Sequence, residues 1–228
     1  GLALLVRFSQ ALGPAWETFV PLLSVLTILT MTLGNVVALA QQNVKRLLAY
    51  STIGQVGYLL IGVVTRTPVG LEALLVYLAA YLVMNVGAFA CVAAVCRETG
   101  SESLEAFRGL AKRAPMLALF CTLFLLSLAG IPPLVGFIGK FLLFGSAIEA
   151  NRLLLAVAAA LNSAIALYYY VAIIRRMYLD APSASTSVRL APALQVAIGA
   201  CGAATVWLGV FPSALLRWLG GHAAAFLR

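Results

Sequence analysis

The segment from residue 115 to 148 constrains the fold most, because it is almost entirely apolar and yet carries Pro132, Pro133 and Lys140. Its 34 residues would form a straight helix about 51 Å long, whereas the hydrocarbon core of a bilayer is roughly 30 Å thick. The segment therefore cannot be one upright membrane-spanning helix.

Pro132 and Pro133 predict where this helix breaks. Both lack a backbone N–H group, and a proline disfavours the helical conformation of the residue before it. Gly130 and Gly136 loosen the backbone on either side. We predict two half-helices, about 115–129 and 134–147, joined by an unwound stretch near the bilayer midplane. Such a backbone is tolerated there only if protein covers it or if it lines a watery cavity, and broken helices of this kind point to transport sites.

The rest of the chain has the composition of an integral membrane protein. Hydrophobic residues make up 63% of its 228 residues and charged residues only 10%, whereas about 25% of the residues in a soluble domain are charged. We predict an all-α, polytopic bundle with six full spans and one partial helix, forming a single transmembrane domain over 1–228. The partial helix is expected at 1–12, and the spans at 19–40, 46–65, 70–96, 115–147, 152–179 and 190–211. Because the first residues read as the end of a helix already under way, we expect an N-terminal part to precede them.

The long connection before Pro115 contains the stretch SESLEAFRGLAKR. Leu104, Phe107 and Leu110 would share one side of a helix, with charges between them. This pattern is typical of an amphipathic helix lying on the membrane surface. A solvated loop fits the pattern equally well.

The distribution of basic residues predicts the orientation of the bundle. With alternating crossings, one side collects Lys45, Arg46, Arg97, Arg108, Lys112, Arg113, Arg175, Arg176 and Arg189. The other side collects Arg7, Arg66, Arg152, Arg217 and Arg228. The positive-inside rule makes the first side cytoplasmic, so the net charge of +8 reflects topology and a nucleic-acid partner is not expected.

Lys140 belongs to neither side, because it follows the predicted break by one to two turns. A lysine charged at this depth costs about 2.5 to 3.5 kcal/mol on insertion scales, so burial favours its neutral form. A lysine that exchanges its proton readily can take part in proton transfer. The alternative is a lysine whose long stem carries the ammonium to the periplasmic interface.

Further polar residues interrupt the predicted spans. Tyr77, Tyr81 and Asn85 recur every fourth position and so share a helix face. Gln55 lies in the span over 46–65, and Asn162 and Ser163 interrupt the span over 152–179. Polar groups inside a membrane either join helices by hydrogen bonds or line a water-filled path. Around a single lysine, they form a candidate proton path.

No signature of a soluble enzyme or of a metal site accompanies these residues. The four cysteines, Cys91, Cys96, Cys121 and Cys201, lie in apolar stretches without the spacing of a metal site. The single histidine is His222, and no phosphate-binding loop or dinucleotide fingerprint occurs. We expect no metal and no redox centre on this chain.

Three stretches, MTLGNVVALAQQNVKRLLAYSTIGQVGYLLIGV, YLAAYLVMNVGAFACV and LSLAGIPPLVGFIGKFLLF, resemble the C-terminal half of subunit N of NADH–quinone oxidoreductase, respiratory complex I, and of its counterpart in the photosynthetic NAD(P)H–quinone oxidoreductase. The resemblance covers nearly the whole chain in order. It implies an antiporter-like subunit, related to subunits of sodium/proton antiporter complexes, that contains two inverted five-helix repeats. The chain would hold the second repeat, over 19–179, and the final span.

The resemblance also implies roles for individual residues. Lys140 matches the family's lysine after a broken helix, at the exit of the proton path toward the periplasm, and Pro132 and Pro133 match the break. Lys45 and Arg46 match a basic pair that we place at the cytoplasmic interface. Gln55 stands where several relatives carry histidine, which removes a titratable group. The family's membrane-embedded glutamate and two further lysines would lie before Gly1.

The function implied is that of a proton-translocating membrane subunit of a NADH:quinone oxidoreductase. NADH, FMN, iron–sulfur clusters and quinone would be bound by partner subunits, and the chain would contact other membrane subunits and lipid in a bacterial inner membrane or an organellar energy-converting membrane. Two alternatives remain open. The chain could come from a multi-subunit cation/proton antiporter, or it could be a structural membrane subunit that does not pump.

Overall fold

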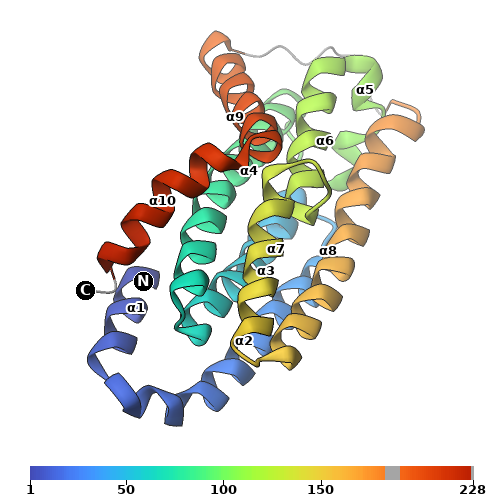
Figure 1. The fold of residues 1–228 in the computed structure, drawn as a ribbon. Coiled ribbons are helices and arrows are strands. Elements are labelled where there is room, and N and C mark those ends of the chain that lie inside the picture. The colour runs from blue at the N-terminus through green and yellow to red at the C-terminus, as the bar shows by residue number, and fades with distance from the viewer. Residues whose placement is uncertain (183–190, 227–228) are drawn as a thin grey trace.

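Helices account for nearly all of the described structure, which is a computed structural model covering the backbone of residues 1–182 and 191–226 and the side chains of 1–182 and 191–219. Arg189, Arg228 and the side chain of His222 lie outside the described residues. In chain order the elements are α1 (Leu2–Ala11), η1 (Gly13–Ala15), α2 (Trp16–Leu39), α3 (Val44–Thr65), α4 (Pro68–Thr99), η2 (Leu104–Phe107), α5 (Leu110–Arg113), α6 (Pro115–Ala129), α7 (Val135–Glu149), α8 (Leu153–Leu179), α9 (Pro192–Val210) and α10 (Pro212–Phe226) (Figure 1).

The all-α membrane architecture is confirmed. In the described part of the chain, five helical segments are long and apolar enough to cross a bilayer, namely η1 with α2, α3, α4, α8 and α9. The helices α6 and α7 together form the broken span, and they end and begin within one residue of the predicted break. The predicted starts at 46 and 70 each lie two residues after the observed starts of α3 and α4, which are fixed by capping side chains. Asn43 accepts a hydrogen bond from the Arg46 N–H at the start of α3, and Thr67 does the same for the Gly70 N–H at the start of α4.

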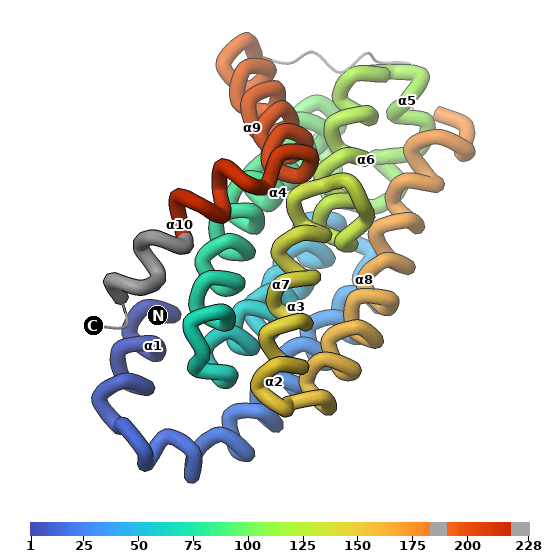
Figure 2. The backbone as a smooth tube through the Cα atoms, in the orientation of Figure 1, coloured from blue at the N-terminus to red at the C-terminus, as the bar shows by residue number. Residues whose placement is uncertain are grey.

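Helix α7 lies at the centre of the bundle. It packs against α3, α4, α6, α8 and α9, while α2 packs along α3 and α8. Figure 2 shows α9 and the beginning of α10 on the flank formed by α4, across the bundle from α8. Large apolar side chains on the outer faces of α2 and α8 are exposed, as lipid-facing or partner-facing surfaces require.

Helix α10 is an addition to the predicted elements. Phe211 and Pro212 end α9, and Pro212 starts the new helix at its first position, where a missing N–H costs nothing. The stretch is too short, and Arg217 too near its middle, for the sequence to read as a span. It packs against α4 and α9.

The prediction for the SESLEAFRGLAKR stretch was wrong in both of its forms. The stretch makes two short pieces, η2 and α5, separated at Gly109, whose φ of 62° ends any continuous helix. The Gly109 N–H donates to the Arg176 carbonyl at 3.0 Å and so ties this connection to α8. Leu104, Phe107 and Leu110 are buried against the bundle, because protein rather than lipid covers this apolar side.

The two groups of basic residues separate as predicted, as far as they are described. At one end, Lys45 pairs with Glu102, and Arg108 and Arg176 both pair with Glu105. At the other end, Arg66 donates to the Gly13 carbonyl at 2.5 Å, and Arg152 pairs with Glu17 at 2.9 Å. The spans therefore alternate in direction as the positive-inside argument assumed.

Candidate functional site

The break between α6 and α7 is a defined turn. Gly130 adopts a φ of 90°, and its N–H donates to the carbonyls of Leu126 and Ser127. The Leu134 N–H donates to the Ile131 carbonyl at 3.2 Å, which closes a turn around the two prolines. Only glycine adopts the Gly130 conformation without strain, so this residue fixes where α6 ends.

Protein covers this turn. A Cβ atom on Gly209 of α9 would collide with the carbonyl of Pro133, so the two backbones are in direct contact there. On the other side, the Gly136 N–H donates to the Ser127 hydroxyl at 3.2 Å and joins α7 back to α6. The unwound backbone is therefore enclosed within the bundle, as a membrane-embedded break requires.

Lys140 projects from α7 toward the end of α6 and is only 3% exposed. Its Nζ donates to the carbonyls of Leu128 and Ala129 at 2.9 and 3.1 Å and to the Ser163 hydroxyl at 3.0 Å. The side chain therefore does not extend to a membrane interface. The two carbonyls belong to the last turn of α6, where carbonyls lack helical partners and the helix dipole is negative.

The acceptors around Lys140 are all neutral. Three oxygen atoms can each take one of the three protons of the ammonium, and the ring of Tyr58 lies 4.6 Å from Nζ and adds a cation–π contact. Burial opposes the charge, while the acceptors and the ring support it. Because no carboxylate among the described side chains pairs with it, the lysine can give up its proton without breaking an ion pair there.

A chain of side chains leads away from Lys140 toward the Lys45 end of the bundle. Gln55 donates to the same Leu128 carbonyl at 3.3 Å, and also to the Tyr170 hydroxyl at 3.4 Å. Tyr77 donates a short hydrogen bond to the Gln55 carbonyl oxygen, and Tyr170 shares another with Ser51. Gln55 therefore connects α3 to three other helices, α4, α6 and α8.

A second polar cluster lies between α2 and α8. Asn35 donates to the Asn162 carbonyl oxygen at 3.2 Å and accepts from the Tyr169 hydroxyl at 2.9 Å. Asn162 in turn donates to Thr32 at 3.1 Å, and Thr32 is only half-buried. Asn162 and Ser163 are neighbours in sequence but belong to different clusters.

Two of the predicted path residues lie apart from the contacts of Lys140. Tyr81 is half-buried and donates to Thr52 at 3.0 Å. Asn85 is half-buried and joins none of the hydrogen bonds described above. Tyr77, Tyr81 and Asn85 follow one another along a helix face, but each lies about 6 Å further along α4 than the last, so only Tyr77 reaches Gln55.

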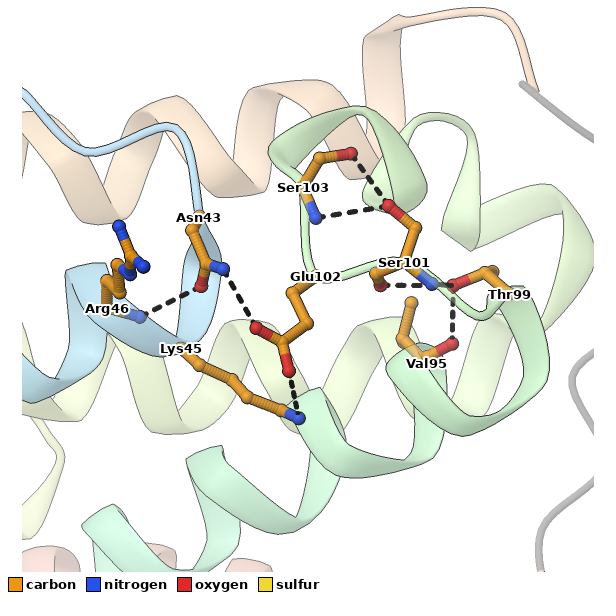
Figure 3. A network of polar contacts seen from close by, with 8 residues as sticks. All are labelled: Asn43, Lys45, Arg46, Val95, Thr99, Ser101, Glu102 and Ser103. Atoms are coloured by element: carbon orange, nitrogen blue, oxygen red, sulfur yellow. Dashed lines mark hydrogen bonds and ion pairs between the residues drawn. The ribbon is translucent and has the colours of Figure 1, made fainter.

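Lys45 lies in a different environment, in the first turn of α3 (Figure 3). Its Nζ lies 2.6 Å from Glu102 Oε1, and the two side chains are 43% and 46% exposed. Asn43 donates to the other oxygen of Glu102 at 2.8 Å, and Asn43 and Ser103 form a β-bridge. The hydrogen bonds from Lys45 and Asn43 hold the pKa of the Glu102 carboxyl below its ordinary value. Arg46 contributes its backbone N–H to the Asn43 cap.

Asn35 and Ser51 were not among the predicted path residues, although the structure places both in the polar clusters. Ser51, Gln55 and Tyr58 are spaced four and three residues apart, which is the signature of one helix face, so Ser51 had a detectable signal. Asn35 is the one amide in the apolar sequence of α2. Burying a polar side chain inside a membrane costs free energy, so Asn35 could also have been singled out from the sequence.

The chain matches the family model described as NADH:quinone oxidoreductase/Mrp antiporter, TM, over residues 1–166. It is 44% identical over 221 residues to NADH-quinone oxidoreductase subunit N of Anaeromyxobacter sp. (strain Fw109-5), covering 92% of this chain and 42% of that relative. It is 39% identical to NAD(P)H-quinone oxidoreductase subunit 2 of Prochlorococcus marinus (strain MIT 9303), covering 98% of this chain and 44% of the relative. The chain thus spans less than half the length of these relatives.

Solved structures agree with these relatives. A chain of respiratory complex I from Thermus thermophilus with bound NADH superposes with a TM-score of 0.89 at 31% identity, over 100% of this chain and 48% of that one. A chain of the Mrp complex from Dietzia sp. DQ12-45-1b has a TM-score of 0.85 at 24% identity, over 92% of this chain and 47% of that one, and so shares the fold. From the family model, these relatives and the shared fold, we conclude that the chain belongs to the NADH:quinone oxidoreductase/Mrp antiporter family of membrane proteins.

Proposed function

We propose that this chain is the part of a proton-translocating membrane subunit, subunit N of a complex I-type NADH:quinone oxidoreductase, that contains the output lysine of one proton channel. The single observation that carries the proposal is the position of Lys140. It is a buried amine held by two carbonyls and one hydroxyl at the end of a broken helix, and no carboxylate of the described residues contacts it.

In this role Lys140 takes a proton from the polar side chains on its inner side and releases it toward the periplasm when neighbouring charges change. Gln55, Tyr77, Tyr170 and Ser51 line the connection that leads to it. Each hydroxyl on such a path accepts one proton and gives another, so the path is restored after each transfer.

The remainder of the channel belongs to other parts of the assembly. The relatives that this chain matches are more than twice its length, so the carboxylate and the further lysines of the channel are expected in their N-terminal half. The NADH, FMN, iron–sulfur and quinone chemistry is assigned to partner subunits, in a bacterial inner membrane whose cytoplasmic face lies at the Lys45 end. Charge movement from that chemistry supplies the driving force.

The test is Lys140→Ala in the assembled complex, with Lys112→Ala as the matched control, because Lys112 is exposed in the short helix α5. We expect Lys140→Ala to lose proton pumping, measured as protons moved per NADH oxidised in inverted vesicles, while assembly is retained. Undiminished pumping at normal assembly would support the structural alternative. Sodium-dependent ion flux without electron transfer would support the antiporter alternative.

A further inference from the structure

Tyr58 is the one buried hydroxyl that has no hydrogen-bond partner among the side chains that the structure describes. The side chain is 0% exposed. A buried polar group without a partner destabilises the fold, and Phe at this position would avoid that cost, so the hydroxyl is expected to have a function.

The position of Tyr58 suggests that reason. The face of its ring lies 4.6 Å from Lys140 Nζ, and the ring packs edge-on against Tyr77, with centroids 6.4 Å apart. Ser163 and the Tyr58 ring both contact Lys140 Nζ, and Ser163 and Asn35 are the side chains that interact with the Tyr58 hydroxyl without forming a full hydrogen bond to it. Ser163 belongs to the cluster around Lys140, whereas Asn35 belongs to the cluster between α2 and α8.

We propose that the Tyr58 hydroxyl is a switchable link that joins these two clusters and so gives Lys140 a second branch of the proton path. This inference rests on the proposed function. Rotation of one C–O bond turns the hydroxyl toward Ser163 or toward Asn35, without any movement of the ring from its contact with Lys140. The branch runs from Lys140 through Ser163 and Tyr58 to Asn35.

The far end of this branch reaches the outside of the bundle. Asn35 bonds to Asn162, and Asn162 donates to Thr32, which is half-buried at the contact of α2 with α8. The other branch, through Gln55 and Tyr170, stays inside the bundle and runs toward the Lys45 end. The two branches therefore start at one lysine, and only the new one ends at the contact of α2 with α8. In a transfer along the new branch, Ser163 and Tyr58 each accept one proton and release one. Asn35 and Asn162 each take a proton at the carbonyl oxygen and release one from the amide nitrogen, and each then returns from its imidic acid form to the amide. The charge moved is the one that Lys140 gives or receives.

The test is Tyr58→Phe in the assembled complex, which removes the hydroxyl and keeps the ring. Because this hydroxyl makes no hydrogen bond in the structure, a purely structural role predicts unchanged or slightly raised thermal stability and unchanged pumping. We instead expect the same stability and the same NADH oxidation in uncoupled vesicles, but proton pumping lowered about tenfold, because Ser163 and Asn35 lose the hydroxyl that passes a proton between them. Tyr168→Phe is the matched control, because that ring is 72% exposed on the outer side of α8.

Lys140→Ala in the same preparation distinguishes a failure of the Tyr58 link from a failure of the proposed function. If Lys140→Ala abolishes pumping while Tyr58→Phe pumps within twofold of the parent, the Tyr58 link is overturned and the proposed function stands. If Lys140→Ala pumps normally, the proposed function is overturned and the link falls with it. Lowered pumping in Tyr58→Phe together with lost pumping in Lys140→Ala supports both.

Discussion

Lys140 and Lys45 show what two environments make of the same side chain. Lys45 is nearly half exposed in the first turn of α3 and pairs with the carboxylate of Glu102. Lys140 is buried in α7 and contacts only neutral acceptors. A carboxylate partner keeps Lys45 charged, so this lysine can only join the first turn of α3 to the connection after α4. Neutral acceptors let the second lysine exist with or without its proton, and this freedom is what proton transfer requires.

Replacing each lysine with arginine tests the difference between Lys140 and Lys45, and it has the largest expected effect on proton pumping. Arginine cannot release its proton in a protein. We expect Lys140→Arg to lower proton pumping at least about a hundredfold, as the loss of a proton-transfer group does, and Lys45→Arg to leave it within about twofold, because the pair with Glu102 needs only a charge. Pumping per NADH oxidised measures both. Equal effects of the two variants would remove the distinction.

Gly136→Ala tests whether the surroundings of Lys140 are as tightly built as the structure shows. A Cβ atom at this position would overlap the Ser127 carbonyl at the end of α6, whereas a Cβ on Gly145 of the same helix meets nothing within 4 Å. We expect Gly136→Ala to destabilise the subunit by about 1 to 3 kcal/mol and to reduce the amount assembled. Gly145→Ala should assemble normally. Immunoblots of the complex and its thermal unfolding give the answer, and an unaffected Gly136→Ala variant would contradict the described contact.

Ser163→Ala removes one of the three acceptors of Lys140. Because the two carbonyls of α6 remain, we expect pumping to fall about threefold to tenfold and not to disappear. Ser146 is the matched control, since it is buried on α7 and donates to its own helix at Leu143, 2.8 Å away. Ser146→Ala should pump normally. A complete loss in Ser163→Ala would show that the hydroxyl, and not the helix end, holds the amine.

The smallest effect is expected for Glu102→Gln at the other lysine. Because hydrogen bonds lower the pKa of Glu102 in the folded protein, the stabilisation from this pair is present above the ordinary carboxylate range and is lost as the pH falls through the lowered value. The pair is exposed and screened by salt. We expect Glu102→Gln to unfold within about 2 °C of the parent at pH 7, and the difference to vanish in acid. Thermal unfolding at pH 7 and at pH 3 tests this.

Much of the fold could be predicted because the membrane leaves few alternatives. Apolar runs of about 20 residues must be helices, and Pro132 and Pro133 place the break to within a residue. The loop at 101–114 was less predictable, because Gly109 takes a left-handed conformation that depends on the neighbouring chain at Pro182 and Arg176. A local pattern carries no information about such long-range contacts.

The sequence predicted the central residue of the candidate site, Lys140, but not which polar side chains connect to it. The cost of a charge at depth singles out Lys140 from sequence alone. Which polar residues reach it depends on helix rotation and tilt, so Tyr77 contacts Gln55 while Asn85 on the same helix does not. The orphan hydroxyl of Tyr58 could not be foreseen at all, since a missing partner is a property of three dimensions.

The amine of Lys140 is anchored on one half-helix and its acceptors on the other. Its backbone belongs to α7, but the oxygens of Leu128 and Ala129 belong to the last turn of α6, and the turn at Gly130 lies between them. Any bend at that turn moves the nitrogen relative to the oxygens that solvate it. A change in the angle between α6 and α7 would therefore change how strongly the amine of Lys140 holds its proton.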